Sequence, residues 1–261
     1  MIVWLNDKEF EQCLTFAQRC ALNQQRIEFG QTDTTPRGIS EIGRDNMIGK
    51  MAEVAFAKMM HNRYGIDIEL DFNYYPRGKW DDQDAVINGW LIDVKATRKG
   101  GRWMLIEWSK LNFRQKQHKL SHLYVMASVD WDRSHDLPQR EVDLIGCASI
   151  TRLLPSAEKT VVLPKGSCIP HTHTRLQADN YGINFSDLET DWDKVMRYIL
   201  NHKPPDLSSY PNPYTGKPLP PSPDPVLYEP AKKPVYAETT HSQPKPWWRK
   251  LSSWIKKLFT T

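Results

Sequence analysis

Three stretches of the chain place apolar residues every three or four positions, which is the period of a helix with one buried face. They cover residues 6–27, 41–60 and 188–200. Asn6, with Glu9 three residues later, has the pattern of a capping box, in which each side chain accepts a hydrogen bond from the other residue's backbone N–H. The pattern predicts three helices that pack against a core, the first of them beginning at Asn6.

Four other stretches are rich in β-branched and aromatic residues and predict strands. They cover residues 66–70, 103–108, 123–129 and 142–150. The last two are predominantly apolar runs, which is typical of strands buried on both faces of an α/β sheet. Residues 151–180 show neither period and are predicted to be irregular or short-stranded.

Residues 82–97 carry the strongest local signal in the chain. Asn88 and Gly89 separate two β-rich runs, and these residue types best tolerate the positive φ angles of a two-residue type I′ turn. A β-hairpin with this turn pairs Ile87 with Trp90, Val86 with Leu91 and Ala85 with Ile92. The same register places Asp84 opposite Asp93.

The hairpin brings acidic side chains together on one face. Opposed side chains in a sheet lie about 4.5–5.5 Å apart at Cβ, so the like charges of Asp84 and Asp93 should repel each other. Side chains alternate between faces along a strand, which places Lys95 on the same face as Asp93 and opposite Asp82. Hard carboxylate oxygens suit Mg²⁺ or Mn²⁺, so the pattern predicts a divalent metal ion between the acids.

Charge is concentrated at the C-terminus rather than spread over the chain. The formal net charge is +4, and residues 245–261 hold five basic residues and no acidic one. Residues 1–244 therefore carry 30 basic and 31 acidic groups. Any contact with nucleic acid would need a local basic patch rather than a general positive field.

The four cysteines are scattered, with no C-x-x-C pair and no secretory signal before them, which predicts a reducing, cytoplasmic setting. A zinc site at Cys168, His171 and His173 is less favoured than a surface loop, since no fourth ligand is evident. No apolar run approaches the roughly 20 residues of a membrane span, so no transmembrane segment is expected.

A motif of the form D-x8-D-V-K at residues 84–95 follows G-K-M-A-E at residues 49–53, which lies on a predicted helix. This combination resembles the PD-(D/E)xK nuclease superfamily, which includes restriction enzymes, Holliday-junction resolvases and λ-type exonucleases. The resemblance covers roughly residues 40–150 and identifies no subfamily. It implies an α/β fold with a restriction-endonuclease-like core, in which a mixed central β-sheet is flanked by helices.

The resemblance also implies a role for each residue of the motif. Asp84, Asp93, Glu53 and the carbonyl of Val94 would hold Mg²⁺ or Mn²⁺. Lys95 would position the attacking water and stabilise charge. The catalytic residues implied are Glu53, Asp84, Asp93 and Lys95.

Two alternatives stay open at these positions. A glutamine stands directly before Asp84, where the family often has proline, and this leaves Asp82 as a rival first acid, although the turn register favours Asp84. Glu53, considered alone, would be a solvated helix residue paired with Lys50 or Lys58.

Basic residues follow the motif and are candidates for contacts with DNA phosphates. They lie in the connection after the hairpin and on a further predicted helix at residues 109–120: Arg98, Lys99, Arg102, Lys110, Arg114 and Lys116. The competing interpretation is an ordinary solvated face.

Composition changes sharply at Lys203. Residues 1–202 form the predicted nuclease-like domain, the proline-rich residues 203–245 predict a disordered, extended linker, and residues 246–261 predict a basic amphipathic helix. The apolar face of that helix consists of Trp247, Trp248, Leu251, Trp254, Ile255 and Leu258. A helix this short is marginal alone in water, so we expect it to dock on a partner protein, an anionic membrane surface or the nuclease-like domain itself.

The sequence thus predicts a divalent-metal-dependent DNA endonuclease whose tail targets it to a partner complex, in a phage, mobile-element or defence setting. The alternative is a protein that binds DNA or a partner on a nuclease-like scaffold without cutting. Metal-dependent nicking of a plasmid would separate the two.

Overall fold

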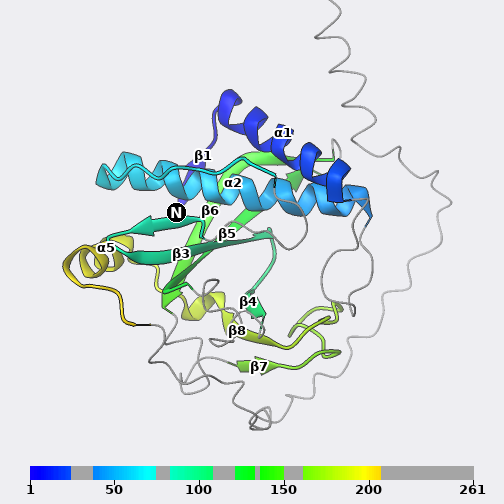
Figure 1. Cartoon of the computed structure of the whole chain (residues 1–261). Helices are drawn as coiled ribbons and strands as arrows, with labels where there is room; N and C mark the ends of the chain where they lie inside the picture. The colour runs from blue at the N-terminus through cyan, green and yellow to red at the C-terminus, as the bar shows by residue number, and fades with distance from the viewer. Residues whose placement is uncertain (25–37, 75–82, 108–120, 133–135, 150–160, 207–261) are drawn as a thin grey trace, which may run out of the picture.

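The computed structural model describes residues 1–24, 38–74, 83–107, 121–132, 136–149 and 161–206. Two β-sheets form its centre, and two long helices cover one face of the larger sheet (Figure 1). The larger sheet has five strands in the order β1-β6-β5-β3-β2, and the smaller has three in the order β4-β8-β7. Strands β3 and β5 are parallel and the other pairs of the larger sheet are antiparallel, which confirms the predicted mixed α/β class.

The structure contains the helices predicted at residues 6–27, 41–60 and 188–200 and the strands predicted at residues 103–108, 123–129 and 142–150, and it adds a short strand at residues 2–4 that was not predicted. The larger sheet consists of β1 (Ile2–Trp4), β2 (Ala85–Ile87), β3 (Trp90–Arg98), β5 (Leu123–Asp132) and β6 (Leu137–Ser149). The smaller sheet consists of β4 (Trp103–Glu107), β7 (Val161–Leu163) and β8 (Asn180–Asn184). The helices are α1 (Asp7–Gln24), α2 (Ile39–Tyr64) and α5 (Trp192–Asn201), with a 3-10 turn at Phe185–Asp187.

Two apolar cores lie on opposite faces of the larger sheet. The first joins that sheet to α1, α2 and α5. The second joins it to the smaller sheet, where Met104 of β4 and Tyr181 of β8 cluster with Tyr124 and Met126 of β5. Helices therefore flank one face as predicted, and a second sheet that was not predicted covers the other (Figure 1).

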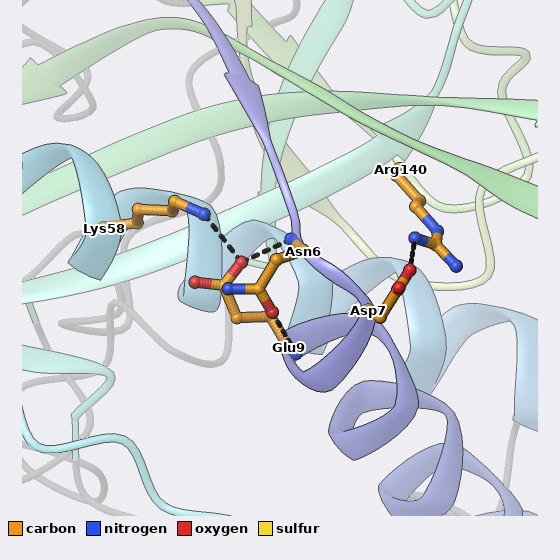
Figure 2. A network of polar contacts seen from close by, with 5 residues as sticks. All are labelled: Asn6, Asp7, Glu9, Lys58 and Arg140. Atoms are coloured by element: carbon orange, nitrogen blue, oxygen red, sulfur yellow. Dashed lines mark hydrogen bonds and ion pairs between the residues drawn. The ribbon is translucent and has the colours of Figure 1, made fainter.

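The capping box at the start of α1 is confirmed. The N–H of Asn6 donates to Glu9 Oε2 at 2.7 Å, and the N–H of Glu9 donates to Asn6 Oδ1 at 2.9 Å. Lys58 Nζ of α2 also donates to Glu9 Oε2, at 2.7 Å, and Arg140 of β6 pairs with Asp7 (Figure 2). The helix start is thus tied both to α2 and to the larger sheet.

The helix predicted at residues 41–60 is longer at both ends and becomes α2. It ends at Gly65, whose φ of 66° lies in the left-handed region that glycine adopts without steric cost. The N–H of Gly65 donates to the carbonyl of His61 at 3.0 Å and closes the last turn. One face of α2 is buried along its length, which fixes the orientation of Glu53.

The hairpin is confirmed in turn type and register. Asn88 and Gly89 have φ angles of 49° and 81°, as a type I′ turn requires. The pairs are Ala85 with Ile92, Val86 with Leu91 and Ile87 with Trp90. Strand β2 is at the edge of the larger sheet, and its ladder with β3 ends at the pair of Ala85 and Ile92, so Asp84 lies one residue beyond the last pair.

The predicted strand at residues 66–70 is wrong. Ile66, Ile68 and Leu70 are half-buried against the helical core, but the segment pairs with no strand in the part of the chain that the structure describes. Alternating burial arises here because an extended segment lies along the helices with one side inward. The period of two is therefore satisfied without a sheet.

The third predicted helix begins four residues later than expected, as α5. Asp191 caps it, since its side chain accepts a hydrogen bond from the N–H of Lys194 at 3.0 Å.

The predicted helix at residues 109–120 and the terminal helix at residues 246–261 lie outside the described residues, as does almost all of the predicted linker. Along the described residues, no helix is both long enough and apolar enough to cross a bilayer.

The turn of the hairpin is anchored to the end of α5. Asn88 Nδ2 donates to the carbonyl of Ile199 at 2.9 Å, and Trp90 Nε1 donates to the carbonyl of His202 at 2.9 Å. A Cβ on Gly89 would lie 3.5 Å from a side-chain carbon of Pro204. The hairpin is thus held at its turn by the last described segment of the chain.

His122, just before β5, adds a second anchor. Its Nδ1 accepts a hydrogen bond from the N–H of Leu91 at 2.9 Å, so Nδ1 carries no proton and Nε2 donates to the carbonyl of Pro205 at 3.0 Å. Burial lowers the pKa of His122, an effect partly offset by the bond to Pro205. The bond from Leu91 requires the neutral ring, because a proton on Nδ1 would displace the Leu91 N–H, whereas the bond to Pro205 can form in either state.

This arrangement predicts a stability that depends on pH through His122. A histidine whose pKa is lowered in the folded state stabilises the fold fully above its unfolded pKa of about 6.5, and that contribution is lost as the pH falls below it. His122→Ala should cost about 1–3 kcal/mol at pH 7.5, since the Leu91 N–H loses its acceptor. Urea unfolding should show a smaller cost at pH 5.5. The exposed His173→Ala is the control, and an equal cost of His122→Ala at both pH values would contradict the assignment.

Candidate functional site

The four residues of the predicted site come from three elements and meet at the edge of the larger sheet. Glu53 lies on α2, Asp84 directly precedes β2, and both Asp93 and Lys95 lie on β3. The charges of Glu53, Asp93 and Lys95 all act on Asp84 and change its pKa, which places the four side chains in one electrostatic cluster. Asp82, the rival first acid, lies outside the described residues.

Asp84 is held by the backbone of the neighbouring strand. Its Oδ2 accepts a hydrogen bond from the N–H of Val94 at 2.6 Å, where a longer β2 would have continued the ladder. The N–H and C=O of one residue in an antiparallel ladder point to the same side. The carbonyl of Val94 therefore points to the same edge as Asp84, as the predicted ligand set requires.

The acidic cluster is electrostatically strained around Asp84. Burial is the largest cause that raises the pKa of Asp84, followed by the negative charges of Glu53 and Asp93. Lys95 and the N–H of Val94 lower the pKa but do not compensate, so it lies well above its usual range. A positive charge beside Asp84 would relieve this repulsion.

Asp93 and Lys95 form an ion pair on β3. The side chains are 25% exposed for Lys95 and 14% for Asp93. Burial lowers the pKa of Lys95, but the charges of Asp93 and Asp84 and the hydrogen bond to Asp93 outweigh it and raise the pKa above the usual value. Lys95 is therefore a fixed cation that can donate hydrogen bonds, and it is not a general base.

Glu53 is paired with Lys50, as the alternative interpretation of the helix foresaw, but neither residue is solvated. Lys50 is only 3% exposed and Glu53 15%. Lys50 Nζ also donates to the carbonyl of Asp71 at 2.7 Å and lies 4.6 Å and 5.4 Å from the ring centres of Phe16 and Phe72. Lys50 thus fixes the Glu53 carboxylate from inside the protein.

Sequence reasoning missed this role of Lys50. The sequence contained one signal for this role. Lys50 lies on the buried stripe of α2, where a charged lysine needs a partner to compensate for its burial. Lys58, the other candidate partner of Glu53, pairs with Glu9 instead. The assignment of partners depends on α1 and on the segment after α2, which no local pattern connects.

A smaller polar network fixes the residue before Asp84. Ser121 Oγ donates to Oε1 of Gln83 at 2.7 Å, and the hydroxyl of the buried Tyr124 accepts from the N–H of Ser121 at 3.3 Å. Tyr124 is aligned with Asp93 in the parallel ladder. Gln83 is thus tied through Ser121 to β5, which helps to hold Asp84 in position.

The donor set suits a hard divalent cation. The negative charges of Glu53 and Asp93 both act on Asp84, and this repulsion is the kind that a bound cation removes. Within the described ranges, no three His, Cys, Asp or Glu side chains form a ready-made metal group. Two of the carboxylates contact ammonium groups instead, in the pairs of Glu53 with Lys50 and Asp93 with Lys95.

The predicted DNA-contacting residues divide into two groups. Arg98 and Lys99 lie at the end of β3 and Arg102 precedes β4, and all three are exposed. Lys99 pairs with Asp130 at 3.1 Å. The others, Lys110, Arg114 and Lys116, lie outside the described residues, as do the six apolar residues of the terminal helix, Trp247, Trp248, Leu251, Trp254, Ile255 and Leu258.

The less favoured zinc site gains no support. Cys168 pairs with Arg175 in an isolated bridge, and the N–H of Ile169 donates to the carbonyl of Thr174 at 2.9 Å. These contacts make a small surface turn that carries His171 and His173. The described part of the chain holds no group of metal-ligating side chains here.

Comparison with known proteins adds no relative: no family model matches the chain, and neither the curated proteins nor the solved structures contain a match. Function is therefore inferred from the residues and their geometry.

Proposed function

We propose that this protein is a divalent-metal-dependent DNA endonuclease of the PD-(D/E)xK type, with a restriction-endonuclease-like core. The observation that carries the proposal is the meeting of Glu53, Asp84 and Asp93 with Lys95 at one sheet edge. The mixed sheet with α1 and α2 on one face agrees with such a core. The proposal is also supported by the mutual effect of charges from α2, the residue before β2, and β3, which are far apart in the sequence.

Each side chain has a distinct part in the proposed reaction. Asp84, Asp93, Glu53 and the carbonyl of Val94 would hold Mg²⁺ or Mn²⁺. When bound, the ion would polarise the scissile phosphate and lower the pKa of a coordinated water. Lys95, which keeps its charge at neutral pH, would donate a hydrogen bond to the attacking water or to a phosphate oxygen and stabilise the negative charge of the transition state.

The C-terminal segments would decide where the enzyme acts. The last described residues run beside the hairpin, through the bonds to Trp90 and His122. We propose that residues 203–245 tether the terminal helix, which docks on a partner protein or an anionic membrane surface, or on the domain itself. A cytoplasmic phage, mobile-element or defence protein fits this organisation.

One observation favours a second candidate, a DNA- or partner-binding protein that does not cut. The pairs of Lys50 with Glu53 and Lys95 with Asp93 neutralise two of the acids without any metal. Asp84 argues against this second candidate. Burial and the neighbouring negative charges disfavour the ionised form of its carboxylate, and a site that only binds DNA or a partner gains nothing from that arrangement.

The test is incubation of the full chain with supercoiled plasmid, linear duplex and single-stranded oligonucleotide in Mg²⁺, Mn²⁺ or EDTA. Nicking or cutting of any of these with a metal, and none in EDTA, is the expected result. Binding of DNA without cutting under every metal condition, with the partner captured by residues 246–261 present, would instead establish the second candidate.

A further inference from the structure

A cavity of about 310 Å³ lies at the far end of β3 from the hairpin turn. It is formed by the start of α2, the ends of β3 and β5, and Asp136 just before β6. Its lining residues are Arg44, Arg98, Lys99, Asp130, Trp131 and Asp136. Two of these, Arg98 and Lys99, were predicted to contact DNA, whereas Arg44 and Trp131 carried no prediction.

The charges in the cavity leave two guanidinium groups available. Lys99 pairs with Asp130 at 3.1 Å, and Asp136 accepts a hydrogen bond from Trp131 Nε1 at 3.1 Å. Arg44 Nε donates to a backbone carbonyl of its own helix at 3.2 Å. Neither Arg44 nor Arg98 has a carboxylate partner among the residues the structure describes, so both can bind an anion.

Trp131 is held in one orientation within this cavity. Besides the bond from its ring to Asp136, its backbone N–H donates to Asp130 Oδ1 at 2.9 Å. The side chain is only half-buried, with part of the ring packed on the helical core. A fixed indole beside two guanidiniums offers a stacking surface and phosphate donors together, which is the combination that binds unpaired nucleotides.

The cavity lies at a defined distance from the acidic cluster. Arg44 precedes Glu53 by nine residues on α2, which corresponds to about 14 Å at 1.5 Å per residue. Arg98 follows Asp93 by five residues on β3, which corresponds to about 17 Å at 3.3 Å per residue. The two elements run in opposite directions and give similar separations, so the cavity and the acidic cluster are far enough apart for a few nucleotides of one strand to lie between them.

We propose that this cavity binds one nucleotide of the DNA strand a few positions from the bond that is cut, with Arg44 and Arg98 on its phosphate and Trp131 stacked on its base. Only an unpaired base presents a free face to the indole, so the substrate is single-stranded at this position. The inference rests on the proposed function for the nature of the ligand, and it adds the substrate class that the acidic cluster leaves open.

The test measures binding in EDTA, where no cleavage occurs, with the full chain and a fluorescein-labelled dT20 strand or the matching 20-base-pair duplex. Arg44→Ala should weaken binding of the single strand about 5–10-fold and lower the slope of log K against log salt by about 0.7, the value for one phosphate contact. Trp131→Leu should weaken it by about 5-fold or more, as loss of one stacked base predicts, and Trp131→Phe should restore most of it. The duplex should bind more weakly than dT20 and should not respond to Trp131→Leu.

Two surface changes serve as matched controls: Arg175→Ala, an exposed arginine bonded to a backbone carbonyl, and Trp4→Leu, a tryptophan 59% exposed. Both should bind dT20 like the unchanged protein. Equal binding by Arg44→Ala, Trp131→Leu and the controls would overturn the proposal, as would absence of dT20 binding or equal losses for single strand and duplex. Because binding is measured without metal, the result does not depend on cleavage. The proposed nucleotide site can therefore be present in a protein that never cuts DNA, and it can be absent from an active nuclease.

Discussion

Lys95→Met is expected to lower the rate of metal-dependent DNA cleavage by about 10²–10⁴-fold, the range for removal of one charge-stabilising or proton-transferring group. Lys95 is a partly buried cation whose pKa is raised by Asp93 and Asp84, so it carries its charge throughout the neutral range. Methionine keeps the length and apolar stem of the side chain and removes the charge. The rate should be measured in a single turnover with saturating Mg²⁺.

The same substitution should leave metal affinity unchanged or make it tighter. Without the ammonium group, Asp93 loses its ion-pair partner and becomes freer to bind a divalent cation. A fall in rate without a fall in Mn²⁺ affinity therefore distinguishes a group that acts in the reaction from one that only supports the site. Lys194→Met removes a lysine that is also ion-paired, on α5, and should change the rate less than 2-fold or so. Rates for Lys95→Met equal to those of this control would refute the role.

Asp84→Asn is expected to abolish cleavage and, at the same time, to stabilise the metal-free protein by on the order of 1 kcal/mol. The pKa of Asp84 is raised by burial and by Glu53 and Asp93, which means that the fold disfavours the ionised side chain. Asparagine removes the charge and can still accept the Val94 N–H through its side-chain oxygen. Such a residue lowers the stability of the protein but is needed for its activity, which is typical of a functional site.

The sign of the pH dependence follows from the same pKa. An acid whose pKa is raised in the folded state destabilises the fold fully above that pKa, and the penalty disappears as the pH falls through it toward the unfolded value of about 3.9. The stability gain of Asp84→Asn in EDTA should therefore be largest near pH 8 and should vanish in acid. Asp67→Asn, at an aspartate whose side chain is 87% exposed, should change stability by less than about 0.5 kcal/mol. A clear loss of stability in Asp84→Asn at pH 8 would contradict this reading of the site.

Local sequence patterns predicted those parts of the fold that depend on a few neighbouring residues. Asn88 and Gly89 adopt the turn their φ preferences favour, and the register of the hairpin follows from it. Asn6 and Glu9 cap α1 through each other's N–H groups. The hairpin register also placed Asp84 beside the strand of Asp93, which is why the core of the site could be read from sequence.

Other features of the fold depend on tertiary contacts between distant segments and could not be predicted from local sequence patterns. The second sheet brings β4 next to β8, which is more than 70 residues later in the chain, and no local pattern encodes that pairing. Residues 66–70 alternate like a strand and yet find no partner strand among the described residues. Lys50 was recognisable as a possible partner of Glu53, but its burial depends on the rings of Phe16 and Phe72, from two other segments.

The most direct test of the metal site is a Mn²⁺ titration of the full chain, followed by isothermal calorimetry or by the loss of the free Mn²⁺ electron paramagnetic resonance signal. The unchanged protein should bind Mn²⁺ saturably, Asp84→Asn and Asp93→Asn should each weaken binding about 10-fold or more, and Asp67→Asn should bind as the unchanged protein does. No saturable binding by the folded chain, or equal binding by all four proteins, would show that the acids at the edge of β2 and β3 do not hold a metal.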